Sequence, residues 1–216
     1  ELLGLAHKRL GAGLTGFEVM GRFALSLVAK HFPALRVPFL EDDGVPYCVL
    51  LENSDNESED HARARFEALL ETAFEAGCVS DAVVAENLTQ AHQLWHVRES
   101  IPLAQAEEGL NIKHDISIPV SRIPAFVEQT DALLEYELPG VRLVNFGHLG
   151  DGNLHYNVQA PVAPTTPTSC ATTRRASTRW STRPSASSRA PSRPSTASAR
   201  SRSRRWRSTS RRWRWR

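Results

Sequence analysis

The chain has 216 residues, with 26 Lys and Arg against 24 Asp and Glu, but this balance hides two unlike parts. Residues 161–216 hold 15 arginines and no acidic residue, which leaves residues 1–160 with 11 basic and 24 acidic side chains. No apolar run approaches the roughly 20 residues of a transmembrane helix. Three scattered cysteines make neither a disulfide framework nor a Cys-type metal site. We expect one globular domain over 1–160, in a reducing compartment.

The periodicity of apolar residues predicts helices and strands throughout that domain. In chain order they are a helix within 16–32, a strand at 47–51, a helix at 59–76, a short strand within 80–86, a helix from 89 to about 108, a strand at 112–119, a helix from 121 or 122 to about 138, and strands at 141–146 and 154–158. The first helix carries Val19 and Phe23 on its apolar face, and Thr89 is the expected N-cap of the helix that follows residue 88. This order favours an α+β fold, an antiparallel sheet with helices on one face.

The most informative stretch is GHLGDGNLHYN at residues 147–157. Its three closely spaced glycines permit positive φ and a close approach of a ligand to the main chain. If the flanking strands form a hairpin, His148 and His155 converge on one point, and Asn157 points to the same face. Two neutral imidazoles suit Zn²⁺ or Mn²⁺, with a carboxylate and an open position completing the site. An ordinary turn flanked by histidines explains the spacing equally well, and Asp151 is interpreted as a turn residue.

A second pattern joins Arg98, in the middle of a predicted helix, to Lys113, 15 residues later on a strand. The Arg98 guanidinium can bind a carboxylate with two parallel hydrogen bonds, and Lys113 can add a second positive charge. The alternative is a solvated helix face on which Arg98 pairs with Glu99 or Glu107.

Together, the segments WHVRESIPLAQAEEGLNIKHDISIPVSRIPAF and NFGHLGDGNLHYNV resemble the C-terminal cap domain of FAD-linked oxidases of the vanillyl-alcohol-oxidase type. Within that family the chain is most similar to D-2-hydroxyglutarate dehydrogenases and the related D-lactate and glycolate enzymes. The resemblance covers most of residues 16–160, and its GHLGDGN-x-H-x-N motif is highly specific. It implies an α+β, ferredoxin-like cap over the isoalloxazine ring of FAD.

The resemblance also implies roles for individual residues. His148 and His155 match the family's metal-binding histidines, and Asn157 matches a polar contact near the substrate and the flavin. Arg98 and Lys113 match residues that hold the substrate carboxylates and hydroxyl. The implied reaction oxidises a D-2-hydroxy acid, such as D-2-hydroxyglutarate or D-lactate. A divalent metal, Zn²⁺ or Mn²⁺, polarises the hydroxyl, a general base takes its proton, and the α-hydrogen leaves as hydride to FAD.

The sequence departs from the family pattern in three ways. A threonine often lies four residues after the family's arginine, whereas this chain has Pro102. Family members bind FAD chiefly through an N-terminal domain, and they carry a glutamate–histidine pair in a downstream segment resembling SAEHGIG. Neither part occurs in the sequence, so we expect residues 1–160 to be a substrate cap domain without its FAD-binding domain. The fragment itself is then expected to be inactive or nearly so.

Residues 161–216 are composed mainly of Arg, Ser, Pro, Thr, Ala and Trp. At face value they form a disordered basic tail that could bind nucleic acid through phosphate contacts. Read one phase out of frame, however, residues 168–174 become compatible with F-L-R-D-H-E and residues 191–199 with I-S-A-E-H-G-I-G. We therefore predict a frameshift between about Ala160 and Pro167, and nucleic acid is not an expected partner.

The expected partner is a small 2-hydroxy acid, with no membrane span. The location is the cytoplasm of a bacterium or the mitochondrion of a eukaryote. The electron acceptor and the oligomeric state, a homodimer included, stay open. Two other functions are kept as alternatives: a non-catalytic metal-binding module on His148 and His155, and nucleic-acid binding through the tail.

Overall fold

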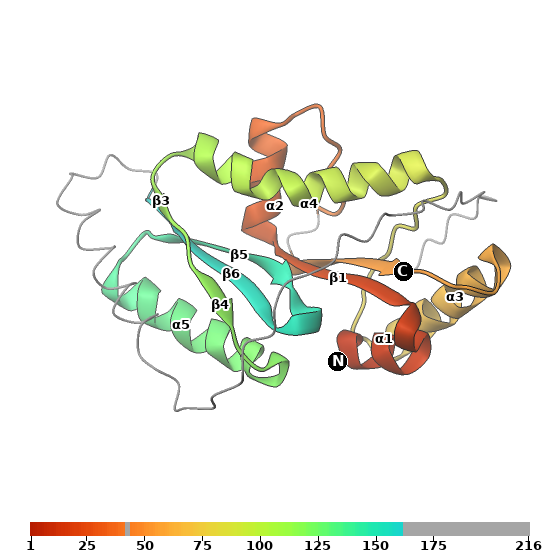
Figure 1. The fold of residues 1–216 in the computed structure, drawn as a ribbon. Helices are drawn as coiled ribbons and strands as arrows, with labels where there is room; N and C mark the ends of the chain where they lie inside the picture. Colours follow the sequence, from red (N-terminus) through yellow and green to blue (C-terminus); the bar gives the residue numbers. More distant parts are fainter. Residues whose placement is uncertain (42–43, 162–216) are drawn as a thin grey trace, which may run out of the picture.

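The computed structural model describes residues 1–41 and 44–161. Its elements, in chain order, are α1 (Leu2–Leu10), β1 (Leu14–Gly21), α2 (Arg22–His31), β2 (Tyr47–Asn53), α3 (Glu59–Glu75), α4 (Leu88–Glu108), β3 (Asn111–Ile112), β4 (Asp115–Ser117), α5 (Ile123–Glu137), β5 (Arg142–His148) and β6 (Asn153–Gln159) (Figure 1). Short 3-10 turns lie at Gly11–Gly13, Val120–Arg122 and Leu149–Asp151. The expected disordered tail lies, from residue 162 onward, outside the described residues.

The strands form one sheet in the order β2-β1-β5-β6-β3, and β4 also pairs with β6. Every pairing is antiparallel. β5 and β6 form the predicted hairpin, with Phe146 opposite His155 and Val144 opposite Asn157. The prediction of an α+β fold with an antiparallel sheet is confirmed.

The helices cover both faces of the sheet, which corrects the expectation that they cover one. Alternate side chains of a strand point to opposite faces. Val144 and Phe146 of β5 accordingly join the core beneath α2 and α4, whereas Leu143 packs with α5. Figure 1 shows α2 and α4 on one side of the sheet and α1, α3 and α5 on the other. The burial pattern of β5 agrees with this arrangement. Its four consecutive residues Val144 to Gly147 are all buried, whereas a strand in a sheet with one solvated face would alternate buried and exposed residues.

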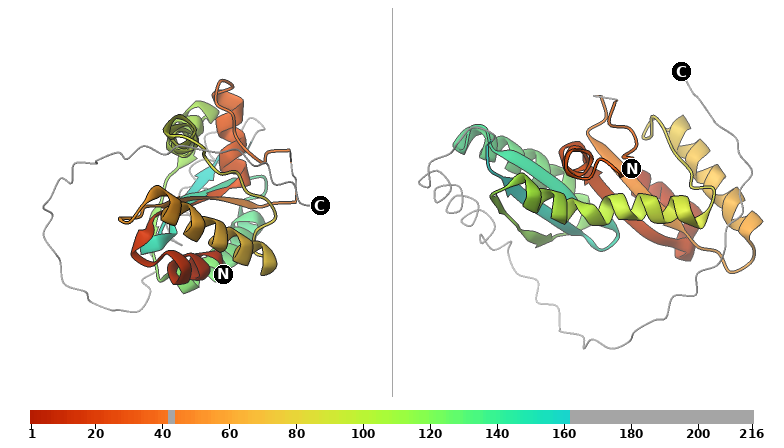
Figure 2. Two further views of the ribbon diagram at one scale, coloured as in Figure 1. Left: turned by 90° about the vertical axis from the view of Figure 1, so that its right-hand side faces the viewer. Right: turned by 90° about the horizontal axis from the view of Figure 1, so that it is seen from above.

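The core beneath α2 and α4 supports the face that carries the candidate site. Ala24, Leu27 and Val28 of α2 pack with Val97 and Ile101 of α4 and with the strands below. Burial of each of the larger apolar side chains contributes about 1.5–3 kcal/mol. Seen from above, α4 runs along the sheet, with α5 and α3 toward opposite ends of the molecule (Figure 2). This core therefore holds α4 in place across the strands.

The C-terminal end of α4 is anchored by the carboxylate of Glu108. It accepts hydrogen bonds from Lys30 at 2.6 Å and Arg142 at 2.5 Å, and it contacts His31 at 2.7 Å. Hydrogen bonding by Lys30, then by Arg142 and His31, outweighs desolvation and lowers the pKa of Glu108 to about 2. One carboxylate thus joins α4 to α2 and β5.

Two sequence predictions about element type were wrong. Val19 lies in strand β1, not on a helix, because the helix begins only at Arg22. Residues 80–86 form no strand, and Val83 and Val84 are more than half exposed. A short β-branched run without a partner strand gains neither a hydrogen-bond ladder nor burial, so its local preference does not decide its structure.

Smaller differences occur at element ends. The N-cap of α4 is Asn87, whose side chain accepts the Gln90 N–H, and not Thr89 two residues later. The strand expected over 112–119 is split into β3 and β4. The other predicted helices and strands are present, with ends that differ from the prediction by a few residues.

Candidate functional site

The β5–β6 loop can close because its glycines leave room for neighbouring groups. A Cβ on Gly152, which has a φ of +76°, would lie 2.2 Å from the Ile118 carbonyl oxygen. A Cβ on Gly147 would lie 2.5 Å from the backbone oxygen of Asn153. Asp151 accepts the Asn153 N–H at 3.1 Å, so its observed contact is that of a turn residue. The loop therefore presses tightly against the chain before α5.

The hairpin puts His148 and His155 on the same sheet face. His155 lies opposite Phe146, with 4.7 Å between the ring centroids, and His148 follows Phe146 by two residues on β5. Each Nδ1 contacts a carboxylate: His148 that of Glu18 at 3.1 Å and His155 that of Asp115 at 2.5 Å. The two histidines have the same local arrangement, with a carboxylate on one ring nitrogen.

Arg98 reaches this cluster from α4 above. Its Nε donates to Glu18 Oε2 at 2.7 Å, and its guanidinium carbon lies 5.0 Å from the centre of the Phe146 ring. The ion pair is therefore with Glu18, and not with Glu99 or Glu107 on its own helix. The side chains of Arg98 and Glu18 are 16% and 9% exposed, so the pair is largely withdrawn from solvent.

Glu18 is the site residue that the sequence analysis missed. It is the one acidic residue in the strand sequence LTGFEVMG, and the residue as a whole is buried. A charge is rarely buried unless it is paired. A lone acid inside an apolar strand was the available signal, although the sequence does not show which partners it meets.

The remaining predicted residues have different surroundings. Asn157 is 2% exposed; its Oδ1 accepts the His114 N–H at 3.0 Å and its Nδ2 donates to Gln105 at 2.8 Å. Both ends of this amide are thus occupied by the protein. Lys113 is exposed, between β3 and β4. Pro102 lies in α4 one turn after Arg98, where it has no N–H to donate to the Arg98 carbonyl.

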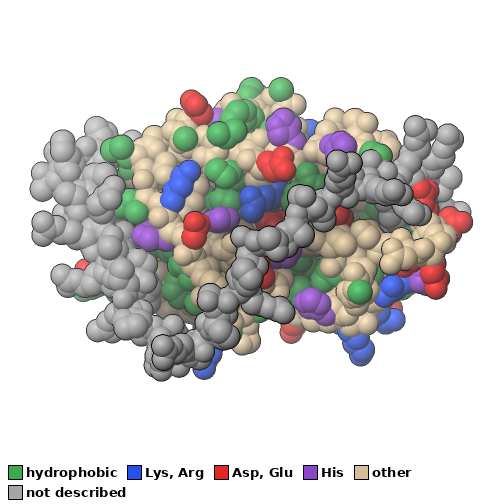
Figure 3. Space-filling model, viewed as in Figure 1, with side chains coloured by type: hydrophobic (Ala, Val, Ile, Leu, Met, Phe, Trp, Pro, Cys, Tyr) green, Lys and Arg blue, Asp and Glu red, His purple; other side chains and the backbone are tan. Residues whose placement is uncertain are grey.

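Histidine, acidic and basic side chains are mixed across the middle of the face seen in Figure 3, below the position of α4 in Figure 1. The same region holds several apolar side chains. Such a mixture can bind a small polar anion at a few charged positions while apolar groups exclude water.

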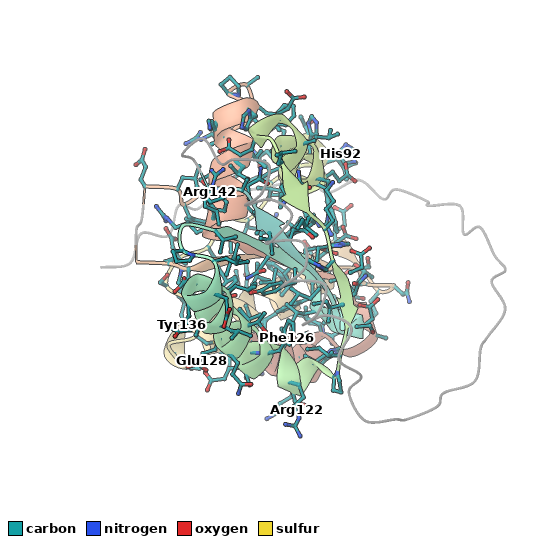
Figure 4. All side chains as sticks on the ribbon, turned by 90° about the vertical axis from the view of Figure 1, so that its left-hand side faces the viewer. His92, Arg122, Phe126, Glu128, Tyr136 and Arg142 are labelled. Carbon is teal, nitrogen blue, oxygen red and sulfur yellow. The ribbon has the colours of Figure 1, made fainter. Side chains whose placement is uncertain are left out.

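The opposite sheet face carries a second polar group, under α5. Phe126 of this helix points toward the sheet and meets Tyr156 edge-on at 5.5 Å, while Glu128 and Tyr136 lie on its outer side (Figure 4). Tyr156 donates to Asp131 at 2.5 Å, and burial raises the pKa values of both groups. None of the predicted site residues belongs to this group, which holds α5 on β6.

One close set of three potential metal ligands occurs within the described ranges, and it lies elsewhere. Asp55, Glu57 and His61 at the start of α3 have ligand atoms within 4.8 Å of one another. The His61 Nδ1 is hydrogen bonded to Asp55 at 2.9 Å and contacts Glu57 at 3.1 Å. Asp55 also accepts the Glu57 N–H. These contacts explain why the three side chains lie together: they hold the turn that precedes α3.

Residues 5–181 match the family described as FAD linked oxidases, C-terminal domain. The chain is 41% identical over 150 residues to the D-2-hydroxyglutarate dehydrogenase of Xanthomonas citri pv. viticola, covering 69% of this chain and 30% of that protein. It is 35% identical over 160 residues to the mitochondrial D-2-hydroxyglutarate dehydrogenase of Arabidopsis thaliana, covering 74% and 28%. For the enzyme of that name from Stutzerimonas stutzeri the identity is 36% over 152 residues, covering 69% and 31%.

The described residues thus form an α+β domain in which two histidines, each next to a carboxylate, lie near a partly buried arginine. The chain belongs to the FAD-linked oxidase family, in the part that forms its C-terminal domain. It spans 28% to 31% of the length of the three relatives. Among the helices of the described residues, none combines the length and the apolar character needed to cross a membrane.

Proposed function

We propose that this chain supplies the substrate-binding part of an FAD-dependent oxidoreductase that converts a D-2-hydroxy acid to the 2-oxo acid. The names of its relatives make D-2-hydroxyglutarate the first substrate to test, and the sequence resemblance makes D-lactate the second. The observation that carries the proposal is the placement of His148, His155 and Arg98 on one sheet face, each fixed by a carboxylate or an aromatic ring.

The two histidines fit a divalent metal site. Histidines that bind metals usually donate their second ring N–H to a carboxylate, and here the Nδ1 atom of each histidine lies at hydrogen-bond distance from a carboxylate. On adjacent antiparallel strands, diagonal neighbours have Cβ atoms at most about 7–8 Å apart, within reach of a shared ion. A Cβ on Gly150 would lie 2.6 Å from His148 Nε2, so any side chain larger than that of glycine would collide with this nitrogen. Zn²⁺ and Mn²⁺ suit such a donor set, and the ion would polarise the substrate hydroxyl.

Arg98 is the proposed anchor for the substrate carboxylate. Its Nε is held by Glu18, and its two terminal nitrogens suit the paired oxygens of a carboxylate. Lys113 would add a second positive charge from the segment before β4. For Asn157, whose amide accepts from the His114 N–H and donates to Gln105, we propose that it positions the strand that carries His155. Bound FAD would accept the hydride.

The proposal is tested by calorimetry on the purified chain, first with Zn²⁺ or Mn²⁺ and then with D-2-hydroxyglutarate added to the metal-loaded protein. We expect metal binding that weakens at least about tenfold in His148→Ala and His155→Ala, because each variant loses a direct ligand. His92→Ala, which removes an exposed histidine of α4, is the matched control. The metal-loaded chain should bind the D acid more tightly than the L acid.

Two results would contradict this function. Metal binding without any response to D-2-hydroxy acids would favour the alternative of a non-catalytic metal-binding module. Metal binding lost in His61→Ala, but not in the other variants, would move the ion to the Asp55 set.

Because the chain is expected to be inactive alone, the purified protein should show no flavin absorbance and no turnover of D-lactate or D-2-hydroxyglutarate.

We also propose that the sequence leaves the family's reading frame between about residues 160 and 167. The downstream glutamate–histidine pair would then be lost, and the arginine-rich composition of the tail would carry no information about partners. Resequencing the coding DNA from about codon 155 past the stop codon is the test. A gained or lost base, with a corrected frame that reads E-H-G, is expected. An unchanged frame contradicts the frameshift and makes salt-dependent RNA binding by residues 161–216 worth measuring.

A further inference from the structure

We propose that Glu18 is the positioning residue of the site, and that its single carboxylate sets the orientation of both Arg98 and His148. This inference rests on the proposed function, since it assigns a role within the same metal and carboxylate site. It adds a residue from β1, whose segment lies outside the motifs that carry the sequence resemblance.

The geometry divides the two carboxylate oxygens between the two partners. Oε2 accepts from Arg98 Nε at 2.7 Å, and Oε1 lies 3.1 Å from His148 Nδ1. The pairing of β1 with β5 puts Glu18 directly opposite His148, so the backbone itself fixes the histidine contact. Met20, two residues along the same strand, lies opposite Phe146, which supports the guanidinium.

This sharing has a defined consequence for His148. An ionised carboxylate can only accept hydrogen bonds, so the contact requires the proton of the neutral ring to be on Nδ1. The lone pair is then on Nε2, the atom available to a metal. Without the carboxylate the ring is free to adopt the other tautomer, in which Nε2 carries the proton and cannot bind an ion.

The contact with Glu18 also sets the orientation of the Arg98 guanidinium. Its Nε donates to Glu18 and its guanidinium carbon lies near the Phe146 ring, and among the described residues its two terminal nitrogens have no hydrogen-bond partner, so we propose that they bind the anion on the same face as His148. Glu18 thereby ties the carboxylate anchor and one metal ligand together. A substrate that bridges the two would meet them at a fixed separation.

Asp115 provides an internal comparison, because it makes the same contact with the other histidine. The Asp115 side chain is 78% exposed, whereas that of Glu18 is 9% exposed. Exposed ion pairs are screened by water and hold their geometry weakly. Asp115→Asn is therefore the matched control for Glu18→Gln, with the same chemical change at a solvated carboxylate.

The test uses the full chain and two readouts, of which the first needs no metal. Nitrogen-15 NMR of the histidine rings at about pH 9, above the ordinary imidazole pKa of about 6.5, reports which ring nitrogen carries the proton. We expect wild-type His148 to carry it on Nδ1. In Glu18→Gln the single amide oxygen cannot serve both partners, so the Nε2-protonated form should become substantially populated. Zn²⁺ affinity by calorimetry should then fall about 10–100-fold, with a smaller loss in Asp115→Asn.

The outcomes separate this inference from the proposed function. If the wild-type chain binds no Zn²⁺, the proposed metal site fails, while the ring tautomer still decides the role of Glu18. Wild-type His148 protonated mainly on Nε2 would overturn the inference, even if Glu18→Gln does not fold. A folded Glu18→Gln with unchanged tautomer and unchanged Zn²⁺ affinity would also overturn it.

Discussion

Arg98→Met should lower the free energy of unfolding by about 3–5 kcal/mol, as expected when one partner of a buried ion pair is removed. The Glu18 side chain is 9% exposed, and the substitution leaves its carboxylate with His148 as the remaining ion-pair partner among the described residues. Methionine keeps most of the length and apolar stem of arginine, so the change isolates the lost charge and hydrogen bond. Urea denaturation of the two proteins at pH 7 measures the difference.

The double variant Arg98→Met, Glu18→Leu serves as the control. Replacing both members of a buried pair by apolar side chains is often nearly neutral, so most of the lost stability should return. If the single and double variants lose the same unfolding free energy, the stabilising effect of Arg98 does not come from its ion pair with the buried Glu18 carboxylate. Both variants should fail to bind D-2-hydroxyglutarate, which separates the stability of the pair from its proposed role.

Gly152→Ala should destabilise the domain by about 3 kcal/mol or more, through two separate costs. A left-handed backbone costs a non-glycine residue about 1–2 kcal/mol, and the φ of Gly152 is +76°. The added Cβ would also lie 2.2 Å from the Ile118 carbonyl oxygen, a backbone atom that can move only with the segment between β4 and α5. Thermal unfolding should show a lower midpoint, and His155 should be displaced with the loop.

Gly77→Ala separates the two costs. Gly77 has a similar φ of +67°, but no atom of the described residues lies within 4 Å of the point that an added Cβ would occupy. It should therefore show the backbone cost alone, about 1–2 kcal/mol. If both variants lose the same unfolding free energy, the loop accommodates the added Cβ at no cost, and its contact with the segment before α5 contributes little to stability.

The features that sequence could predict were those with a local cause. The glycine-rich loop and its flanking apolar strands specify a hairpin within about a dozen residues, and His148 and His155 follow from it through the two-residue period of a strand. The helix at α3 likewise follows from its own spacing and from Ser58, which caps it. In each case the residues that decide the structure are neighbours in the chain.

The features that sequence could not predict depend on distant partners. Glu18 meets His148 across 130 residues and Arg98 across 80, so nothing near LTGFEVMG shows that its acid belongs to a site. The covering of both sheet faces has the same origin, since it depends on which helices reach each side. At residues 80–86 the local β preference was clear, but the described part of the chain provides no neighbouring strand to pair with it.

The position of β1 also bears on how the domain is made on the ribosome. β1 ends at Gly21, whereas its neighbour β5 begins at Arg142. At translation rates of about 5–20 residues per second, β1 waits on the order of ten seconds for that partner. During this interval β1 has an open edge, which favours pairing with other chains. Glu18 lies within that strand, and a charged side chain on an open edge disfavours pairing with other chains, so we expect Glu18 to lower the tendency of the nascent chain to aggregate.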